Sequence, residues 1–218
     1  MAVSSKDIEH IVPKKMHQKI TRNVPVGIRI VLLLTIASIT NDSYPQGFTE
    51  PSQGKAAVYF VRWSSAGAVY SYEYFHHDQF IGEFKGKGYI RHESEPGEQL
   101  FWAASSNKQF ITAHLEAGKS YIIDVETGMY GAILFRPISS KNKSAFKKCK
   151  KTILTSEPIT FTMAELNDGQ KKYHDLIVNE LNYFREKSAE EEPKVKTQFN
   201  FSHFKMSADM FIPKSEMN

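Results

Sequence analysis

Cysteine is almost absent from this chain, which has 218 residues and a single cysteine, Cys149. An intramolecular disulfide is therefore excluded, and a hydrophobic core must supply the stability of the fold. The lysines beside Cys149 favour its thiolate, but a catalytic thiol also needs a placed histidine. No triad signature is present, so we predict no catalytic role for this residue.

Recognisable catalytic signatures are missing as well. The sequence contains no G-x-x-x-x-G-K-[ST] phosphate loop, no G-x-S-x-G elbow and no H-E-x-x-H helix. The net charge of +4 is a mild bias, whereas a nucleic-acid-binding protein needs a more concentrated basic face. We therefore expect a protein that is not an enzyme and that has no cofactor and no nucleic-acid partner.

Long apolar runs are also lacking. The longest, Ile30–Ile39, has about ten residues, and a membrane-spanning helix needs about 20. Basic residues precede this run and polar residues follow it, which is the layout of a secretory signal. We predict that residues 1–46 are a signal peptide, or a membrane anchor over residues 28–40, and that the chain is exported to the periplasm or beyond. The start could be Met1 or Met16, and the alternative is a hydrophobic helix of a cytosolic protein.

The central part of the chain, Gly54–Ile138, has the composition of short strands separated by turns. Aromatic and β-branched residues alternate with polar ones, and both faces of the first strand are apolar, which indicates a central position in a sheet. About eight strands at near-regular spacing predict an all-β sandwich or barrel, and of these two we expect an antiparallel β-sandwich. The expected strands are Ala57–Trp63, Val69–Phe75, Phe80–Phe84, Gly88–Glu93, Leu100–Ala104, Gln109–Leu115, Ser120–Glu126 and Ala132–Arg136.

Several motifs in this block occur in a characteristic order: Gly54–Arg62, Phe80–Phe84, Gly88–Tyr89, Glu95–Glu98 and Leu115–Tyr121. In this order they resemble the bacterial DUF2846 family, a domain of unknown function. The resemblance implies an exported, small β-sandwich of the transthyretin or PEGA-like kind over residues 47–140, acting in the cell envelope. Lipid-anchored relatives carry a cysteine just after the export segment. This chain has none there, so we expect no cysteine-linked lipoprotein.

The composition changes after Pro137. Residues 141–161 are predicted to be a lysine-rich connector with an edge strand in Ile153–Phe161. Thr162 and Glu165 form a capping-box pattern that opens an amphipathic helix over residues 162–188. That helix would pack on the sheet or bind a partner. Residues 189–218 lack a clear period and are predicted to be a poorly ordered tail.

Two groups of residues are candidates for a ligand surface. The first is an aromatic face of one strand, which would bind a sugar or a peptide or pack in the core. The second is a lysine cluster within Lys141–Lys151, which would bind an anionic surface such as phospholipid head groups or a polyanionic glycan, or would be a solvated loop. The candidate residues are Tyr70, Tyr72, Tyr74, Lys147, Lys148, Lys150 and Lys151.

The strongest metal-binding pattern is His76-His77-Asp78, with His92 and His114 as further ligands. Adjacent strand residues point to opposite faces, which favours solvent-facing turn residues instead. We expect a non-catalytic binding or structural module with a protein or glycan partner in the envelope, touching the membrane only through its N-terminal segment. The alternatives are a metal-dependent enzyme using the His76/His77 region and an anionic-surface binder through Lys141–Lys151.

Overall fold

The computed structural model describes residues 46–189 and 201–218. These residues belong to one compact unit, Ser43–Asn218. The predicted signal peptide or anchor, including residues 28–40, lies outside the described part. Within the described ranges, no helix is long and apolar enough to cross a membrane.

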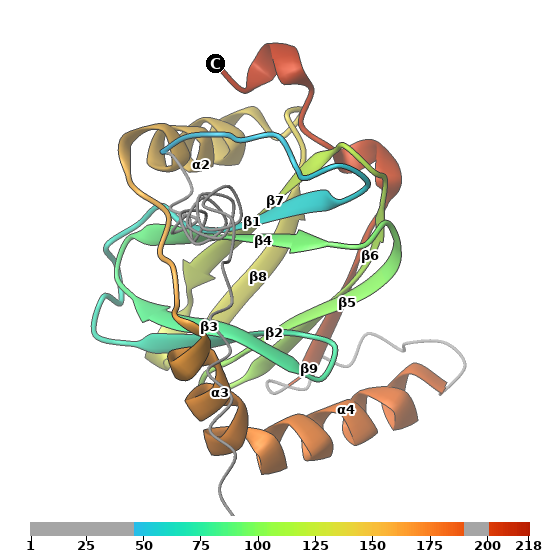
Figure 1. The fold of residues 1–218 in the computed structure, drawn as a ribbon. Helices are drawn as coiled ribbons and strands as arrows, with labels where there is room; N and C mark the ends of the chain where they lie inside the picture. Colours follow the sequence, from blue (N-terminus) through green and yellow to red (C-terminus); the bar gives the residue numbers. More distant parts are fainter. Residues whose placement is uncertain (1–45, 190–200) are drawn as a thin grey trace, which may run out of the picture. The chain divides into compact units, whose positions relative to one another are not determined.

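The fold is mainly β, with two mixed sheets and helices beside them (Figure 1). The first sheet has the strand order β4-β1-β7-β8 and the second has the order β3-β2-β5-β6-β9. The strands are β1 (Ala56–Arg62), β2 (Ser71–His76), β3 (Gln79–Lys85), β4 (Gly88–Ser94), β5 (Gly97–Ala104), β6 (Lys108–Leu115), β7 (Ser120–Thr127), β8 (Ile133–Ile138) and β9 (Phe201–Met206). The eight predicted strands are confirmed, and β9 is additional.

The prediction that all strands are antiparallel is wrong in two places. β1 pairs with β7 in parallel, and β6 pairs with β9 in parallel. Both pairs join segments that are far apart in the chain, so no hairpin turn forces them to be antiparallel. The central position predicted for β1 is confirmed, because it lies between β4 and β7 and all of its residues are buried.

Side chains from both sheets form one shared core. Phe60 of β1 stacks on Phe135 of β8 at 5.8 Å between ring centroids, and Tyr74 of β2 stacks on Phe84 of β3 at 5.2 Å. Phe60 also meets Phe101 of β5 edge-on at 5.6 Å. These aromatic contacts account for the alternation of apolar residues that the strands show in the sequence.

Helices cover the outer faces of both sheets (Figure 1). α2 (Lys143–Thr155) packs on the first sheet through Phe146, Cys149 and Ile153. α3 (Met163–Lys172) and α4 (His174–Ala189) lie on the second sheet. The helices therefore bury part of the outer face of each sheet.

The region after Pro137 differs from its prediction. The lysine-rich connector is helical, since its apolar residues recur at helical spacing between the lysines. No strand is assigned to Ile153–Phe161, although the Ile159 amide donates to the Tyr89 carbonyl at 2.8 Å. The capping box is confirmed, with the Thr162 amide donating to Glu165 Oε2 at 2.7 Å. The single predicted helix is two helices that break at Tyr173.

The predicted tail is ordered over residues 201–218, contrary to expectation, while residues 190–200 lie outside the described part. Phe204 and Met206 alternate along β9 and reach the shared core. Further on, Ile212 is buried against the first sheet and its amide donates to the Ser120 carbonyl at 2.8 Å. The short 3-10 helices Ala208–Met210 and Lys214–Glu216 flank that contact.

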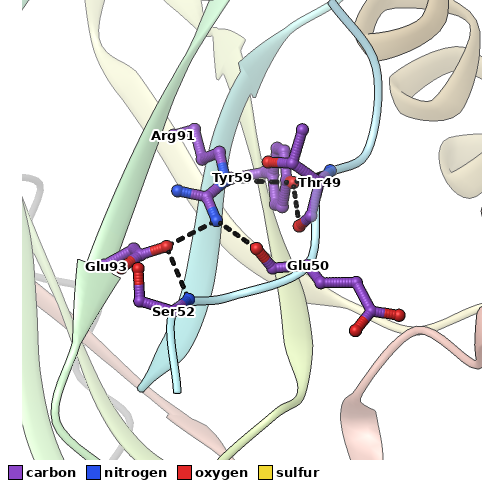
Figure 2. Close-up of polar contacts among 6 residues, drawn as sticks. All are labelled: Thr49, Glu50, Ser52, Tyr59, Arg91 and Glu93. Atoms are coloured by element: carbon purple, nitrogen blue, oxygen red, sulfur yellow. Dashed lines mark hydrogen bonds and ion pairs between the residues drawn. The ribbon is translucent and has the colours of Figure 1, made fainter. Parts of the chain in front are cut away.

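The segment before β1 is fixed to the first sheet by a polar cluster, shown in Figure 2. Arg91 Nη2 donates to the Glu50 carbonyl at 3.0 Å and to Glu93 Oε1 at 2.7 Å. The Thr49 amide donates to the Tyr59 hydroxyl at 2.9 Å, and the Ser52 amide donates to Glu93 Oε1 at 3.0 Å. These bonds satisfy backbone groups of a segment that has no strand partner.

Candidate ligand-binding site

The site begins at the β2–β3 turn, whose backbone is fixed from two sides. His77 has a φ of +51°, which is uncommon for a residue other than glycine. Its amide donates to the Leu100 carbonyl at 2.8 Å, and Trp102 Nε1 donates to its carbonyl at 2.8 Å. On the other side, Gln170 Nε2 of α3 donates to the Asp78 carbonyl at 2.8 Å. The strained turn is thus held by β5 and by a helix.

This backbone brings together histidines that we expected to point apart. The His76 and His77 rings lie 4.8 Å from each other, since the positive φ at His77 turns its side chain back. Gln99 Oε1 lies 2.8 Å from His76 Nε2 and 3.0 Å from His77 Nε2. His76 Nδ1 lies 3.1 Å from His92 Nε2. The expectation of separate faces is therefore wrong for this pair, although His77 itself is exposed.

The hydrogen bonds define one consistent arrangement of the ring protons. With Gln99 Oε1 as the shared acceptor, His76 and His77 carry their protons on Nε2. His76 Nδ1 then accepts from His92 Nε2. Burial lowers the pKa of His76, and burial together with the neighbouring His76 lowers the pKa of His92 to about 3. His76 and His92 are therefore uncharged at neutral pH.

The histidines do not form a recognisable metal site. Among residues 46–189 and 201–218, no group of three or more His, Cys, Asp or Glu side chains is placed to hold one metal ion. His114, the other residue considered, lies on β6 opposite Glu98 of β5 and is exposed. Gln99 occupies the point where His76 and His77 converge, so their nitrogens are already engaged in hydrogen bonds.

Next to the histidines is an open hollow of about 600 Å³ between α4 and strands β5 and β6. This volume lies within the range of about 300–1,000 Å³ that small-molecule sites occupy. We refer to it as the α4 hollow. It is lined by His77, Asp78, Glu98, Gln99, Leu100, Thr112, Leu181, Phe184 and Arg185.

The lining of the α4 hollow combines an apolar part with charges of both signs. Phe184 stacks on Phe110 of β6 at 4.9 Å, which fixes the aromatic wall. Arg185 supplies a cation from α4, and its Nη1 donates to Asn182 Oδ1 at 3.0 Å. Asp78 and Glu98 supply carboxylates from the β2–β3 turn and from β5. The hollow can therefore accept an amphipathic ligand with an anionic and a cationic group.

The predicted aromatic platform is not a surface. Tyr72 and Tyr74 are 0% exposed and belong to the shared core, and the Tyr72 hydroxyl donates to Thr127 Oγ1 at 2.8 Å. Tyr70 precedes β2 and is 41% exposed. The proposal that these three residues form one ligand surface is wrong, because the tyrosine face of β2 is the face that meets the other sheet.

The candidate lysines lie on α2 and do not all face solvent in the same way. Lys147, Lys148 and Lys151 are exposed, but Lys148 Nζ lies over the Trp63 ring at 4.0 Å. Lys150 is half-buried and donates to the backbone oxygen of Asn218. Lys148 and Lys150 therefore make contacts within the chain. None of the four lysines lines the α4 hollow.

Several lining residues were not identified from the sequence. Leu181 and Phe184 belong to the apolar stripe of the predicted helix, which indicated packing and no hollow. Gln99, Thr112 and Arg185 are ordinary polar residues in separate elements, and no motif connects them. His77 and Asp78 were singled out from the sequence as possible metal ligands, and Glu98 was interpreted as a solubilising residue of a turn.

Comparison with known proteins identifies no relative. No protein-family model matches the chain, and no curated protein matches it. The resemblance to DUF2846 is neither supported nor contradicted by these comparisons and stays a prediction from the ordered motifs that begin with Gly54–Arg62.

Proposed function

We propose that this chain is an exported, envelope-associated β-sandwich of the DUF2846 kind that binds a short peptide in the α4 hollow and does no chemistry on it. The two mixed sheets support the sandwich part of this proposal, and α3 and α4 lie where it expects an appended helix. The observation that carries the proposal is the mixed lining of the hollow, with Arg185 on one element and Asp78 and Glu98 on others. A peptide with free termini offers the complementary pair of charges.

A peptide fits this lining better than a glycan. Sugars stack on exposed aromatic faces, and the tyrosine face of β2 is buried. The hollow instead presents Leu100, Leu181 and Phe184, which suit an apolar side chain between the two charged ends. The ligand is accordingly a short free peptide, such as one released from an envelope protein.

The burial and hydrogen bonding of Cys149 and His76 support the proposal that the chain binds its ligand without catalysing a reaction. The Cys149 thiol is buried, and burial raises its pKa, so the thiolate needed for nucleophilic attack is disfavoured. His76 is engaged with Gln99 and His92. A metal-dependent enzyme remains the alternative for this region, and stoichiometric metal in the purified full chain would support it over the peptide binder.

The test is calorimetric titration of the purified full chain with short peptides that contain one apolar residue. Peptides with free termini are compared with the same peptides acetylated and amidated. We expect binding of the free peptides, loss of at least tenfold on capping, and a similar loss in Arg185→Gln. Lys143→Gln, an exposed residue on α2, is the matched control and should bind normally. Equal binding of free and capped peptides would contradict the proposal.

A further inference from the structure

A second surface lies at one end of the two sheets, away from the histidines. The pairings Arg62↔Gly88, Ser71↔Lys85 and Ala104↔Lys108 place several connections at this end, and Thr127↔Ile133 adds another. We refer to these connections together as the loop end. It comprises residues 63–70, 86–87, 105–107 and 128–132.

Apolar side chains are exposed at the loop end. Val69 is 80% exposed, Met129 is 74% exposed and Tyr130 is 84% exposed. They come from two connections that touch, since a Cβ on Gly131 would lie 2.5 Å from the Tyr70 ring. Grouped apolar exposure of this kind marks an interaction surface, whereas single exposed apolar residues do not.

The loop end is held firmly in this arrangement. The Arg62 guanidinium donates to the Tyr70 carbonyl at 3.0 Å, the Gly67 carbonyl at 3.1 Å and Thr127 Oγ1 at 3.3 Å. Arg62 is itself 1% exposed. One buried cation therefore ties the connection before β2 to the end of β7, so the apolar side chains are displayed from a fixed base.

Tyr130 is strained as well as exposed. Its φ of 55° and ψ of 29° lie in the left-handed region, which is unfavourable for a bulky residue. The ring is not buried against the chain, so no packing within the described residues offsets that strain. Strain retained at a protruding residue is typical of a functional contact.

The connections of the loop end carry little charge: Lys87 is the charged residue within them, and Lys85 is the last residue of β3 beside it. Residues 63–71, 85–88, 104–108 and 127–133 contain no Asp or Glu, and Lys85 and Lys87 are exposed among them. Lys108 is paired with Glu180, at 3.1 Å. Carboxylates gather in turns at the opposite end of the sheets, at Asp78, Glu95 and Glu116.

We propose that the loop end docks on an anionic phospholipid surface. Val69, Met129 and Tyr130 enter the headgroup layer, and Lys85 and Lys87 lie at the phosphates. Apolar side chains on turn tips, with two exposed lysines on a neighbouring turn, suit an anionic bilayer interface. A partner protein would need a broader apolar face, because stable interfaces bury about 800 Å² on each side. This surface is separate from the α4 hollow and does not depend on peptide binding.

The first test places an environment-sensitive fluorophore at Tyr130→Cys in the full chain. Cys149 is buried, so the introduced thiol is labelled selectively. Vesicles of phosphatidylcholine with phosphatidylglycerol should shift the emission to the blue, and pure phosphatidylcholine vesicles should shift it less. The matched control is Ala117→Cys in the turn between β6 and β7, which is exposed at the opposite end of the sheets and should show no shift. Because this readout is local, vesicle binding through Ile30–Ile39 does not affect its meaning.

The second test compares vesicle affinities of unlabelled full-chain variants. Val69→Thr/Met129→Gln/Tyr130→Asn removes the apolar tips and keeps similar shapes, and asparagine tolerates the left-handed backbone. Lys85→Gln/Lys87→Gln should lower the affinity for anionic vesicles roughly 25-fold, since each lysine contributes about fivefold. A label at residue 130 that stays in water on bound vesicles, or a blue shift that the Lys85→Gln/Lys87→Gln variant shows as fully as the parent, would overturn the proposal and leave a protein partner as the alternative.

Discussion

Replacing Gly169 by alanine tests how α3 is seated on the second sheet. The helix approaches β3 so closely that a Cβ on Gly169 would lie 2.2 Å from Phe80 Cε1 and 2.4 Å from Phe80 Cδ1. The Phe80 ring cannot move away easily, because it packs edge-on against Phe75 at 5.7 Å and against Tyr173 at 5.3 Å. Gly169→Ala must therefore push the helix or the ring out of place.

Two effects of opposite sign decide the result. Alanine is a better helix former than glycine by about 1 kcal/mol. Overpacking a closed core costs about 1–3 kcal/mol, and the contact at Gly169 is at the severe end of that range. The clash should win, so we expect Gly169→Ala to lower the free energy of unfolding by about 1–2 kcal/mol.

The assay is urea denaturation of the full chain, compared at equal m-values. Asn167→Ala in the same helix is the control, because this side chain is exposed and its replacement gains helix propensity without a clash. It should be unchanged or slightly stabilised. A Gly169→Ala protein at least as stable as the parent would refute the close contact between α3 and Phe80.

Three further predictions concern titration and backbone strain. The pKa of His92 is lowered from 6.5 in the unfolded chain to about 3 in the folded chain, so the unfolded chain takes up this proton at a higher pH. The free energy of unfolding should therefore fall as the pH drops from about 6.5 towards 3. In His92→Gln, urea midpoints measured over this pH range should change less with pH than in the parent. Burial raises the pKa of Asp124 from 3.8 to about 6, so its favourable contribution to the free energy of unfolding is complete below pH 3.8 and is lost as the pH rises through 6. The free energy of unfolding of Asp124→Asn should therefore exceed that of the parent by on the order of 1 kcal/mol at pH 8, with no such gain at pH 4. Tyr130→Asn should raise the free energy of unfolding by about 0.5–1 kcal/mol by relieving left-handed strain, measured by urea denaturation.

The strands were predictable because their side chains alternate with a period of two. The double apolar pattern of Ala56–Arg62 also gave its central position. Which face of β2 meets the core was not predictable, since Tyr72 and Tyr74 face the other sheet and Phe75 faces the helices. The alternation separates Tyr72 and Tyr74 from Ser71 and Glu73, but an aromatic strand face can be either a ligand surface or part of a core.

The errors after Pro137 have separate physical causes. The many lysines of α2 led us to predict a connector, although Phe146, Cys149 and Ile153 recur at helical spacing among them. β9 has only a short alternation, in Phe204 and Met206, and its parallel pairing with β6 joins residues about ninety positions apart. Local sequence cannot specify such a contact, because the stabilising partners come from elsewhere in the fold.

The α4 hollow was largely unpredictable for the same reason. Its residues come from the β2–β3 turn, β5, β6 and α4, and they meet only after both sheets and the helices have packed. The sequence His76-His77 indicated a possible metal site, but whether the two rings lie together depends on the positive φ of His77. That backbone angle is imposed by the bonds to Leu100 and Trp102.

The measurement that tests the account most directly is an NMR titration of the full chain with an apolar peptide whose termini are free. The account predicts that the methyl resonances of Thr112, Leu100 and Leu181 shift together with saturating behaviour, while those of Val69 and Met129 at the loop end stay in place. Shifts confined to residues outside the α4 hollow, or no shifts at millimolar peptide, would contradict the proposed function.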